Sequence, residues 1–494
     1  MAQTDRDVFD KVGQYNLDEL AIISYRFAED SLPRRIDIKG ILYNFEIAED
    51  ILSNNVVGSV IVYDMQDIRT IMPMVGLERL SLKFNSPGLN GYDYSEDTGV
   101  PLQIYKIDKV RKDPQNEKAQ LYQIFFCSPE MYRNVTTKIS RAYAGPVENA
   151  VISIVRDVLK SKKKIYYEPT STNAKYVIPN LRPYDAINFL ATQAKSKKFR
   201  LNAGYKFFET SEAFHFRSID SMMGAGGQFA EVTPKWKYQS MITAVTEDAK
   251  QPELKDIERR LSSVIKYEFD KPVDTLDNIT GGFYANKVTV HDAFNKTIKT
   301  HNYNYSEVGP NQVHTEINTD RFSTVGLLYP EDGSGKGVKF ADTGKSLTEM
   351  YDAKTMVVTE TSKVHNDYEF TPTSLLLPLS THQSQAMRNM NLSLLVYGNT
   401  LVNAGDIITF TSPVQRPGEV ENNPYTSGRY VVMAIKHMVN VESQRHEMVL
   451  KCFKDSVRNA YPKEEDALNS VGTDTRAGLS NIYNLQSDEV LADF

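Results

Sequence analysis

The N-terminal part of the chain alternates apolar and polar residues with the period of a β-strand. Leu80, Leu82 and Phe84, for example, are separated by single polar residues. Because successive side chains of a strand point to opposite faces, such a segment places its apolar residues on one side of a sheet. Several segments of this kind follow one another with short turns between them. They predict a closed antiparallel β-barrel over residues 17–145, preceded by a polar arm at 1–16.

The period changes after Gly145-Pro146. Val147, Val151, Ile154 and Val158 share one face of a helix, and a proline just before them suits the start of a helix. The segment 182–196 shows a second helical pattern. These two helices and the residues around them predict a small α/β module at 146–235.

Strand patterns return after residue 235. They predict a second barrel formed by 236–300 and 381–460 with associated helices, one of them in the charged stretch 252–269. Residues 301–380 show no clear period and are interpreted as an insertion. The polar segment 461–494 is interpreted as a C-terminal tail.

An internal repeat links the two barrels. Residues 105–134 align without gaps on 430–459, and the alignment matches Tyr105 with Tyr430 and Cys127 with Cys452. Five identities in thirty positions can arise by chance, but the strand pattern and the turn placement also coincide, which favours duplication. The predicted fold class is mainly β with α+β parts: two similar antiparallel β-barrels, a small α/β module and an insertion.

Composition and charge narrow the function classes. The chain has 494 residues, of which 41% are hydrophobic and 24% charged, as expected for a globular protein of several domains. Its 57 basic and 63 acidic residues give a formal charge of −6, which argues against a dedicated nucleic-acid binder but not against a protein through which nucleic acid passes. No secretory signal and no apolar run of the ~20 residues that span a bilayer is visible.

Two basic clusters follow the two predicted helices. Basic residues at helix C-termini complement the helix dipole, so solvated helix ends are the favoured interpretation and nucleic-acid contact the alternative. We expect these clusters to face outward or towards a partner rather than to line a channel. Their members are Lys160, Lys162, Lys163 and Lys164 in the first, and Lys195, Lys197, Lys198 and Arg200 in the second.

The search for reactive groups yields no catalytic, cofactor-binding or metal-binding residue. Cys127 and Cys452 each lie in an apolar strand-like run and are interpreted as buried thiols. The eight histidines lack metal-ligand spacing, and the zincin-like start at His446 has Leu450 where the second histidine is required. No nucleophile-elbow motif occurs, and the glycine-rich stretch 332–340 lacks the pattern of a phosphate loop. We therefore expect a protein that is not an enzyme and needs no cofactor.

The order of several short motifs resembles that of baseplate hub proteins from contractile-tailed bacteriophages, with related hubs in other contractile injection machines. The motif residues of the first barrel are Glu49, Asp50, Asn54, Gly58, Asp64, Pro73, Gly76 and Glu78, and those of the second are Gly398, Asn399, Gly405, Asp406, Ser427, Gly428 and His437. The segment 182–196 resembles a helix of the family's intervening module. The chain departs from the family in its long polar stretch 301–380 and lacks a recognisable spike or lysozyme segment.

The resemblance implies a homotrimer in the baseplate of a virion, assembled from subunits made in the host cytoplasm. Its implied partners are a separate central spike protein, tail-tube or tube-initiator proteins, the tape measure protein and baseplate wedge proteins, while genome DNA passes without specific binding. Duplication offers a physical reason, because two similar barrels in each of three subunits present six near-equivalent surfaces to a sixfold tube. The alternatives are a tail-associated cell-wall hydrolase, with its site in 301–380, and a glycan-binding host-recognition protein.

Overall fold

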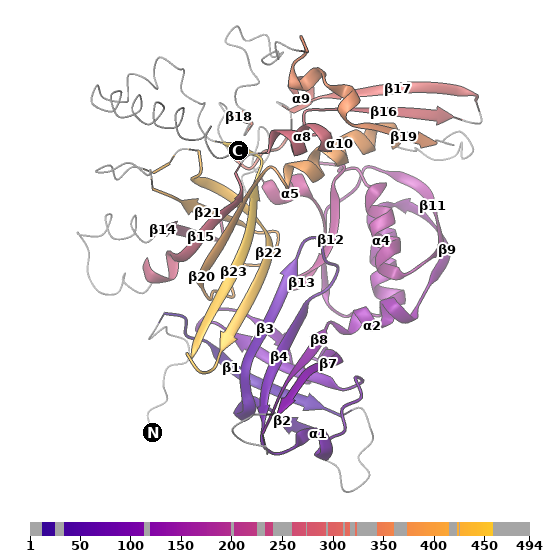
Figure 1. The fold of residues 1–494 in the computed structure, drawn as a ribbon. Coiled ribbons are helices and arrows are strands. Elements are labelled where there is room, and N and C mark those ends of the chain that lie inside the picture. Colours follow the sequence, from indigo (N-terminus) through magenta and orange to yellow (C-terminus); the bar gives the residue numbers. More distant parts are fainter. Residues whose placement is uncertain are drawn as a thin grey trace, which may run out of the picture.

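A computed structural model of the chain describes fourteen segments (Figure 1). They are residues 12–24, 34–112, 119–198, 202–224, 233–240, 259–272, 274–292, 295–309, 312–316, 322–323, 343–359, 373–413, 422–423 and 425–457. Of the predicted N-terminal arm, residues 1–11 lie outside the described residues, and the predicted tail 461–494 lies wholly outside them.

The first barrel is an antiparallel sheet with the strand order β1-β5-β7-β8-β4-β3. Its inward side chains, among them Phe45, Val60, Leu82 and Ile124, are fully buried in one core. The elements are β1 (Asn16–Ile23), β2 (Arg35–Asp37), η1 (Lys39–Ile41), β3 (Leu42–Asp50), β4 (Val57–Asp64), α1 (Ile68–Ile71), β5 (Arg79–Asn85), β6 (Tyr92–Tyr94), β7 (Leu102–Lys112) and β8 (Gln120–Cys127).

This barrel is not closed on itself, contrary to the closed barrel expected from the sequence. Within the described strands, the outer edge of β1 pairs with the short β2, and the outer edge of β3 pairs with β22 of the second barrel. The reason is that β3 meets a longer strand from the other end of the chain, which satisfies the edge hydrogen bonds that ring closure would otherwise satisfy.

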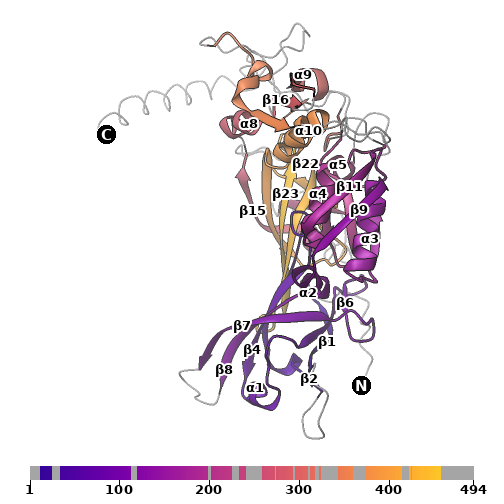
Figure 2. The ribbon, with the colours of Figure 1, turned by 90° about the vertical axis from the view of Figure 1, so that its right-hand side faces the viewer.

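The α/β module stands above the first barrel and beside the second (Figures 1 and 2). Val151, Ile187 and Phe214 belong to its separate core, in which the two predicted helices pack together. Its elements are α2 (Pro129–Thr136), β9 (Ile139–Pro146), α3 (Val147–Ser153), the π-helical η2 (Ile154–Val158), β10 (Lys164–Tyr167), β11 (Asn173–Leu181), α4 (Pro183–Thr192), β12 (Tyr205–Glu209), β13 (Ala213–Ser218) and α5 (Ile219–Met223).

The second barrel is a closed ring of six strands in the order β22-β21-β14-β15-β20-β23, with β23 returning to β22. It is mixed rather than purely antiparallel, because β14 runs parallel to both of its neighbours. Leu394, Phe410 and Leu450 are fully buried inside it. The strands are β14 (Trp236–Ser240), β15 (Ser263–Lys271), β20 (Met390–Tyr397), β21 (Ile407–Thr411), β22 (Gly428–Asn440) and β23 (Arg445–Lys454).

The sequence predicted a helix over the charged stretch 252–269, and the structure contradicts this prediction. Residues 259–262 are helical, but β15 begins at Ser263. Ser263 and Val264 are buried, and the exposed and half-buried residues that follow alternate along the strand. Barrel closure against β20 therefore overrides the local helical tendency.

An excursion between β15 and β20, residues 272–389, carries its own three-stranded sheet, β17-β16-β19. It begins earlier than the insertion expected at 301–380, because β16 and β17 belong to this sheet and not to the barrel. Its elements are α8 (Thr275–Gly281), β16 (Ala285–Asp292), β17 (Thr297–Asn304), α9 (Tyr305–Val308), β18 (Phe322–Ser323), η5 (Leu347–Glu349), η6 (Tyr351–Ala353), β19 (Thr355–Thr359) and α10 (Thr373–Ala386), and β18 pairs with β24 (Ser456–Val457).

The two barrels share one strand order. Read from β1, the first runs β1-β5-β7-β8-β4-β3, and the second runs β14-β21-β22-β23-β20-β15. Corresponding strands also follow one another in the same order along the chain. Only β14 differs, since it runs parallel to β21 whereas β1 is antiparallel to β5. The topology thus agrees with the duplication that the sequence indicated.

The gapless alignment of the repeat, however, does not match equivalent residues. It places Tyr105, which is 46% exposed, on the fully buried Tyr430. Each hairpin has a β-bulge directly after a buried, inward-facing residue, which is Ile104 in β7 and Val432 in β22. Matching the bulges shifts the first strand by three residues, so the duplicated feature is the bulged hairpin.

Candidate assembly surfaces and the junction between the barrels

The two barrels meet in a seam formed by β3 and β22. Seven residue pairs join the strands, from Asn44 opposite Asn440 to Asp50 opposite Ala434. The 13-residue β22 is long enough to pair with β21 near its start and with β3 over its second half. One strand therefore belongs to both barrels, and the sheet is continuous between them.

Glu49 lies near one end of this seam and contacts three parts of the molecule. Its carboxylate accepts hydrogen bonds from the hydroxyl of Tyr92 (2.8 Å), the backbone N–H of Ser211 in the module (2.6 Å) and the backbone N–H of Ala404 in the second barrel (3.0 Å). The side chain is buried, and burial raises its pKa to about 7 although the three donors oppose the shift.

Two buried histidines lie beside the seam. His437 of β22 and His446 of β23 approach each other with 2.9 Å between Nδ1 and Nε2, and both rings pack edge-on against Phe84 of the first barrel. Neither residue is exposed. Burial lowers the pKa of His437 to about 3 and that of His446 well below its usual value, so both rings are neutral near pH 7.

A buried ion cluster joins the module to the first barrel. Lys163 pairs with the fully buried Glu209 and lies 3.6 Å from the carboxylate of Glu130. Glu209 also accepts from the backbone N–H of Val56, at the start of the β4 region, and from the hydroxyl of Ser128. The sequence predicted that Lys163 belongs to a solvated helix end, and this prediction is wrong for Lys163. It compensates two carboxylates that would otherwise be buried without a cation.

Five other members of the basic clusters are exposed, in agreement with the prediction. Lys160, Lys162 and Lys164 are exposed, as are Lys197 and Lys198. Lys195 is half-buried, and Arg200 lies outside the described residues.

A second buried pair holds the excursion against the end of β23. Nδ1 of His314 lies 2.6 Å from Asp455, and its Nε2 lies 2.8 Å from the carbonyl oxygen of Gly309. Both ring nitrogens of His314 therefore face oxygen atoms. Burial opposes ionisation of Asp455, but His314 and Thr315 together hold the pKa of its carboxyl well below the usual range.

Several motif residues of the first barrel shape turns. Glu78 accepts hydrogen bonds from the backbone N–H groups of Val75, Gly76 and Leu77, and Asp64 accepts from those of Gln66 and Ile68. The sequence pattern singled out these two acids, and the structure shows them fixing backbone rather than facing a substrate cleft.

Gly58 allows close packing within the first barrel, and Asn54 contacts the module. A Cβ on Gly58 would collide with the ring of Phe126 and the backbone of Glu46. The amide of Asn54 donates to the carbonyl of Phe207 in the module at 2.7 Å. The motif thus contains residues that attach the module to the first barrel, a role that single-chain patterns do not reveal.

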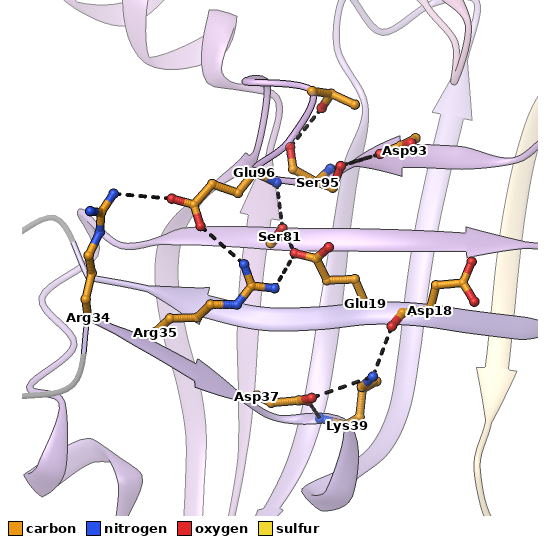
Figure 3. A network of polar contacts seen from close by, with 11 residues as sticks. Asp18, Glu19, Arg34, Arg35, Asp37, Lys39, Ser81, Asp93, Ser95 and Glu96 are labelled. Carbon is orange, nitrogen blue, oxygen red and sulfur yellow. Dashed lines mark hydrogen bonds and ion pairs between the residues drawn. The ribbon is translucent and has the colours of Figure 1, made fainter.

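One outer face of the first barrel is polar and internally paired (Figure 3). Arg35 donates to Glu19 at 2.6 Å and to Glu96 at 3.2 Å, and Arg34 reaches Glu96 from the other side at 3.3 Å. This network covers β1 and β5 next to the short edge strand β2. Charged side chains at such an edge disfavour the addition of another strand.

Another outer face, over β4, β7 and α2, is apolar. Val57, Tyr105 and Val135 are between 37% and 50% exposed there, although each is a hydrophobic residue. Clusters of exposed apolar side chains are typical of surfaces that bind a partner. The two outer faces of the barrel therefore differ in the contacts they favour.

The two cysteines of the chain are buried in strands. Both Cys127 and Cys452 are free thiols, as expected. Within the described residues, no group of three or more His, Cys, Asp or Glu side chains could hold a metal ion. No helix in this part of the chain is long and apolar enough to cross a membrane.

Comparison with known proteins gives likenesses only among solved structures. No protein-family model and no curated protein matches the sequence. A tail protein from Neisseria meningitidis MC58 aligns over 90% of this chain and 97% of its own, with 10% identity and a TM-score of 0.47. The 43 kDa tail protein of prophage MuSo2 from Shewanella oneidensis aligns over 88% and 98%, with 7% identity and a TM-score of 0.47.

A third likeness comes from another kind of injection machine. An Escherichia coli component of the type VI secretion system, described as similar in structure to phage T4 tail proteins, aligns over 86% of this chain and 76% of its own, with 9% identity and a TM-score of 0.38. At this level of similarity no residue role is transferred from these structures.

Proposed function

We propose that this protein is a structural hub of a contractile tail baseplate or of a related injection machine. Three copies form a ring of six alternating barrels, which adapts a sixfold tube to a threefold spike and encloses the channel for the genome. The observation that carries this proposal is the shared strand order of two barrels that one continuous sheet joins in a single chain.

The physical reason is symmetry matching. A sixfold tube needs six similar contacts, while a threefold spike needs three. Three copies supply six similar barrels on the tube side, and the modules and excursions, which occur once per chain, keep threefold symmetry on the other side. The continuous sheet through β22 fixes the angle between the barrels, so the spacing of the six contacts is set within each subunit.

The proposed partners are further copies of this chain, a separate central spike, tail-tube or tube-initiator proteins, the tape measure and wedge proteins. DNA passes through the ring without specific binding, and the protein acts in the virion as a structural component rather than an enzyme. Buried residues of the junction, such as Glu49 and Lys163, act in this proposal by fixing the shape of the subunit.

Light scattering and negative-stain imaging of the full chain, alone and with the spike from its own gene neighbourhood, test the proposal. The expected result is a trimer whose projections show a ring with six lobes, with assembly favoured by concentration or by the spike. Six copies per ring, or a monomer under all these conditions, would contradict it. Turnover of peptidoglycan, or specific binding in a glycan screen, would instead support one of the alternatives.

A further inference from the structure

A cavity of about 480 Å³ lies between the first barrel and the module, beside α2. Four basic residues line it: Arg79, Arg133, Lys160 and Lys162. Among the described residues, neither Lys160 nor Lys162 forms an ion pair. The cavity is therefore a concave surface with a concentration of positive charge, on a chain whose net charge is −6.

The backbone around the cavity is held in an unusual conformation. Helix α3 continues into the π-helical η2, and Lys160 then adopts a left-handed conformation with φ of +48°. Arg133 donates to the carbonyl oxygens of Leu159 and Lys160 at 2.5 and 3.1 Å, which satisfies the end of this helix. Left-handed non-glycine residues cost free energy and often occur at functional sites. Here that conformation places Lys160 at the cavity.

An apolar groove of about 450 Å³ lies on the other side of α2. Val57, Tyr105 and Val135 contribute its exposed hydrophobic side chains. Tyr132 lines both the groove and the basic cavity, so the two hollows adjoin each other. Together they form a surface with one apolar and one cationic half, which we term the α2 surface.

We propose that the α2 surface binds a segment of a partner protein in which apolar side chains stand next to carboxylates. The apolar side chains enter the groove, and the carboxylates face Lys160, Lys162 and Arg133. Apolar anchors beside charged contacts are a common mode of segment recognition, in which the anchor supplies affinity and the charges supply orientation. The proposal does not depend on the number of copies in the ring.

The apolar groove favours a protein segment over a nucleic acid. A nucleic-acid backbone presents phosphates and sugars and has no apolar side chain to enter the groove. Glu130 also lines the basic cavity, but Lys163 lies 3.6 Å from its carboxylate and compensates its charge, so the four basic residues determine the charge of the cavity.

Fluorescence anisotropy with the full-length protein tests the proposal. The probe is a fluorescein-labelled peptide, Gly-Ser-Glu-Asp-Leu-Leu-Glu-Ser-Gly. We expect saturable binding that weakens as salt increases. The double variant Lys160→Glu, Lys162→Glu should weaken peptide binding by at least about tenfold. The exposed change Val135→Gln should also weaken binding, as should replacing both leucines of the peptide by serine.

The matched control is Lys197→Glu, Lys198→Glu, which makes the same charge change elsewhere on the module and should leave the affinity unchanged. Circular dichroism of each variant reports whether the fold is retained. Equal loss in both double variants, or no saturable binding of the peptide, would overturn the proposal. So would tighter binding of a labelled 12-nucleotide single strand that depends on Lys160 and Lys162, which would assign the surface to nucleic acid.

Discussion

The carboxylate of Glu49 accepts a hydrogen bond from the backbone N–H of Ala404, which lies 355 positions further along the chain. Contacts this distant in sequence are formed only when both barrels are folded and in register. The same carboxylate also binds the module, so its contacts report on the assembly of all three parts.

Removal of this carboxylate should loosen the junction. Glu49→Ala leaves buried donors on Tyr92, Ser211 and Ala404 without an acceptor, and we expect a loss of about 2–4 kcal/mol in the free energy of unfolding. The control is Glu46→Ala on the same strand, which removes only a partly exposed pair with Lys436 and should cost less than about 1 kcal/mol. Urea denaturation followed by circular dichroism measures both, and equal effects would refute a special role for Glu49.

The pH dependence of stability should carry the signature of Glu49. Its pKa in the folded protein, about 7, lies above the usual 4.5, so the folded state holds a proton that the unfolded state releases. The contribution of Glu49 to stability is therefore fully present below pH 4.5 and falls by about 3 kcal/mol as pH rises to 7. Glu49→Gln should remove this fall. If urea midpoints at pH 5 and 7 change alike in the variant and the natural protein, the assignment is wrong.

The histidine pair should lower the stability of the protein as pH falls, whereas Glu49 lowers it as pH rises. The pKa of His437 is lowered to about 3 and that of His446 is also lowered, so the unfolded state takes up protons below pH 6.5 and the folded state does not. His437 should cost about 2 kcal/mol of stability between pH 6.5 and 5, and His446 should act in the same direction. Replacing both by leucine should reduce this acid sensitivity, whereas replacing the exposed His291 should not. Midpoints measured at the two pH values distinguish the cases.

Lys163 should matter far more than its neighbour. Lys163→Met leaves Glu209 and Glu130 buried without a compensating cation, and we expect a loss of about 3–5 kcal/mol. Lys164→Met changes an exposed side chain in the same basic run and should stay within about 0.5 kcal/mol of the natural protein. Thermal unfolding of the two variants provides the comparison, and a similar shift in both would show that the ion cluster contributes little.

Local patterns were sufficient to predict most strands and the two helices of the module. Alternation at Leu80, Leu82 and Phe84 gave a strand, and the spacing of Val147, Val151 and Ile154 gave a helix, because these periods reflect which side chains are buried. The same reasoning failed for β15, whose charged residues face solvent from a closed barrel.

Long-range relationships could not be predicted from one sequence. The pairing of Ile47 with His437 depends on the relative placement of two barrels, and no local period records it. Lys163 resembled its exposed neighbours because its two acidic partners are distant in the chain. The repeat was visible, but identical residues such as Tyr105 and Tyr430 suggested a register that the bulges of the two hairpins do not support.

The shared strand β22 also determines how the subunit would carry mechanical load. Thirteen residues of strand extend over about 43 Å, so β22 runs without interruption from one barrel into the other. A force that slides the barrels past each other along β22 loads all seven β3–β22 residue pairs together, in shear. It does not open their hydrogen bonds one after another. In the hub that we propose, the seam would therefore resist sliding of one barrel against the other more strongly than contacts that open singly.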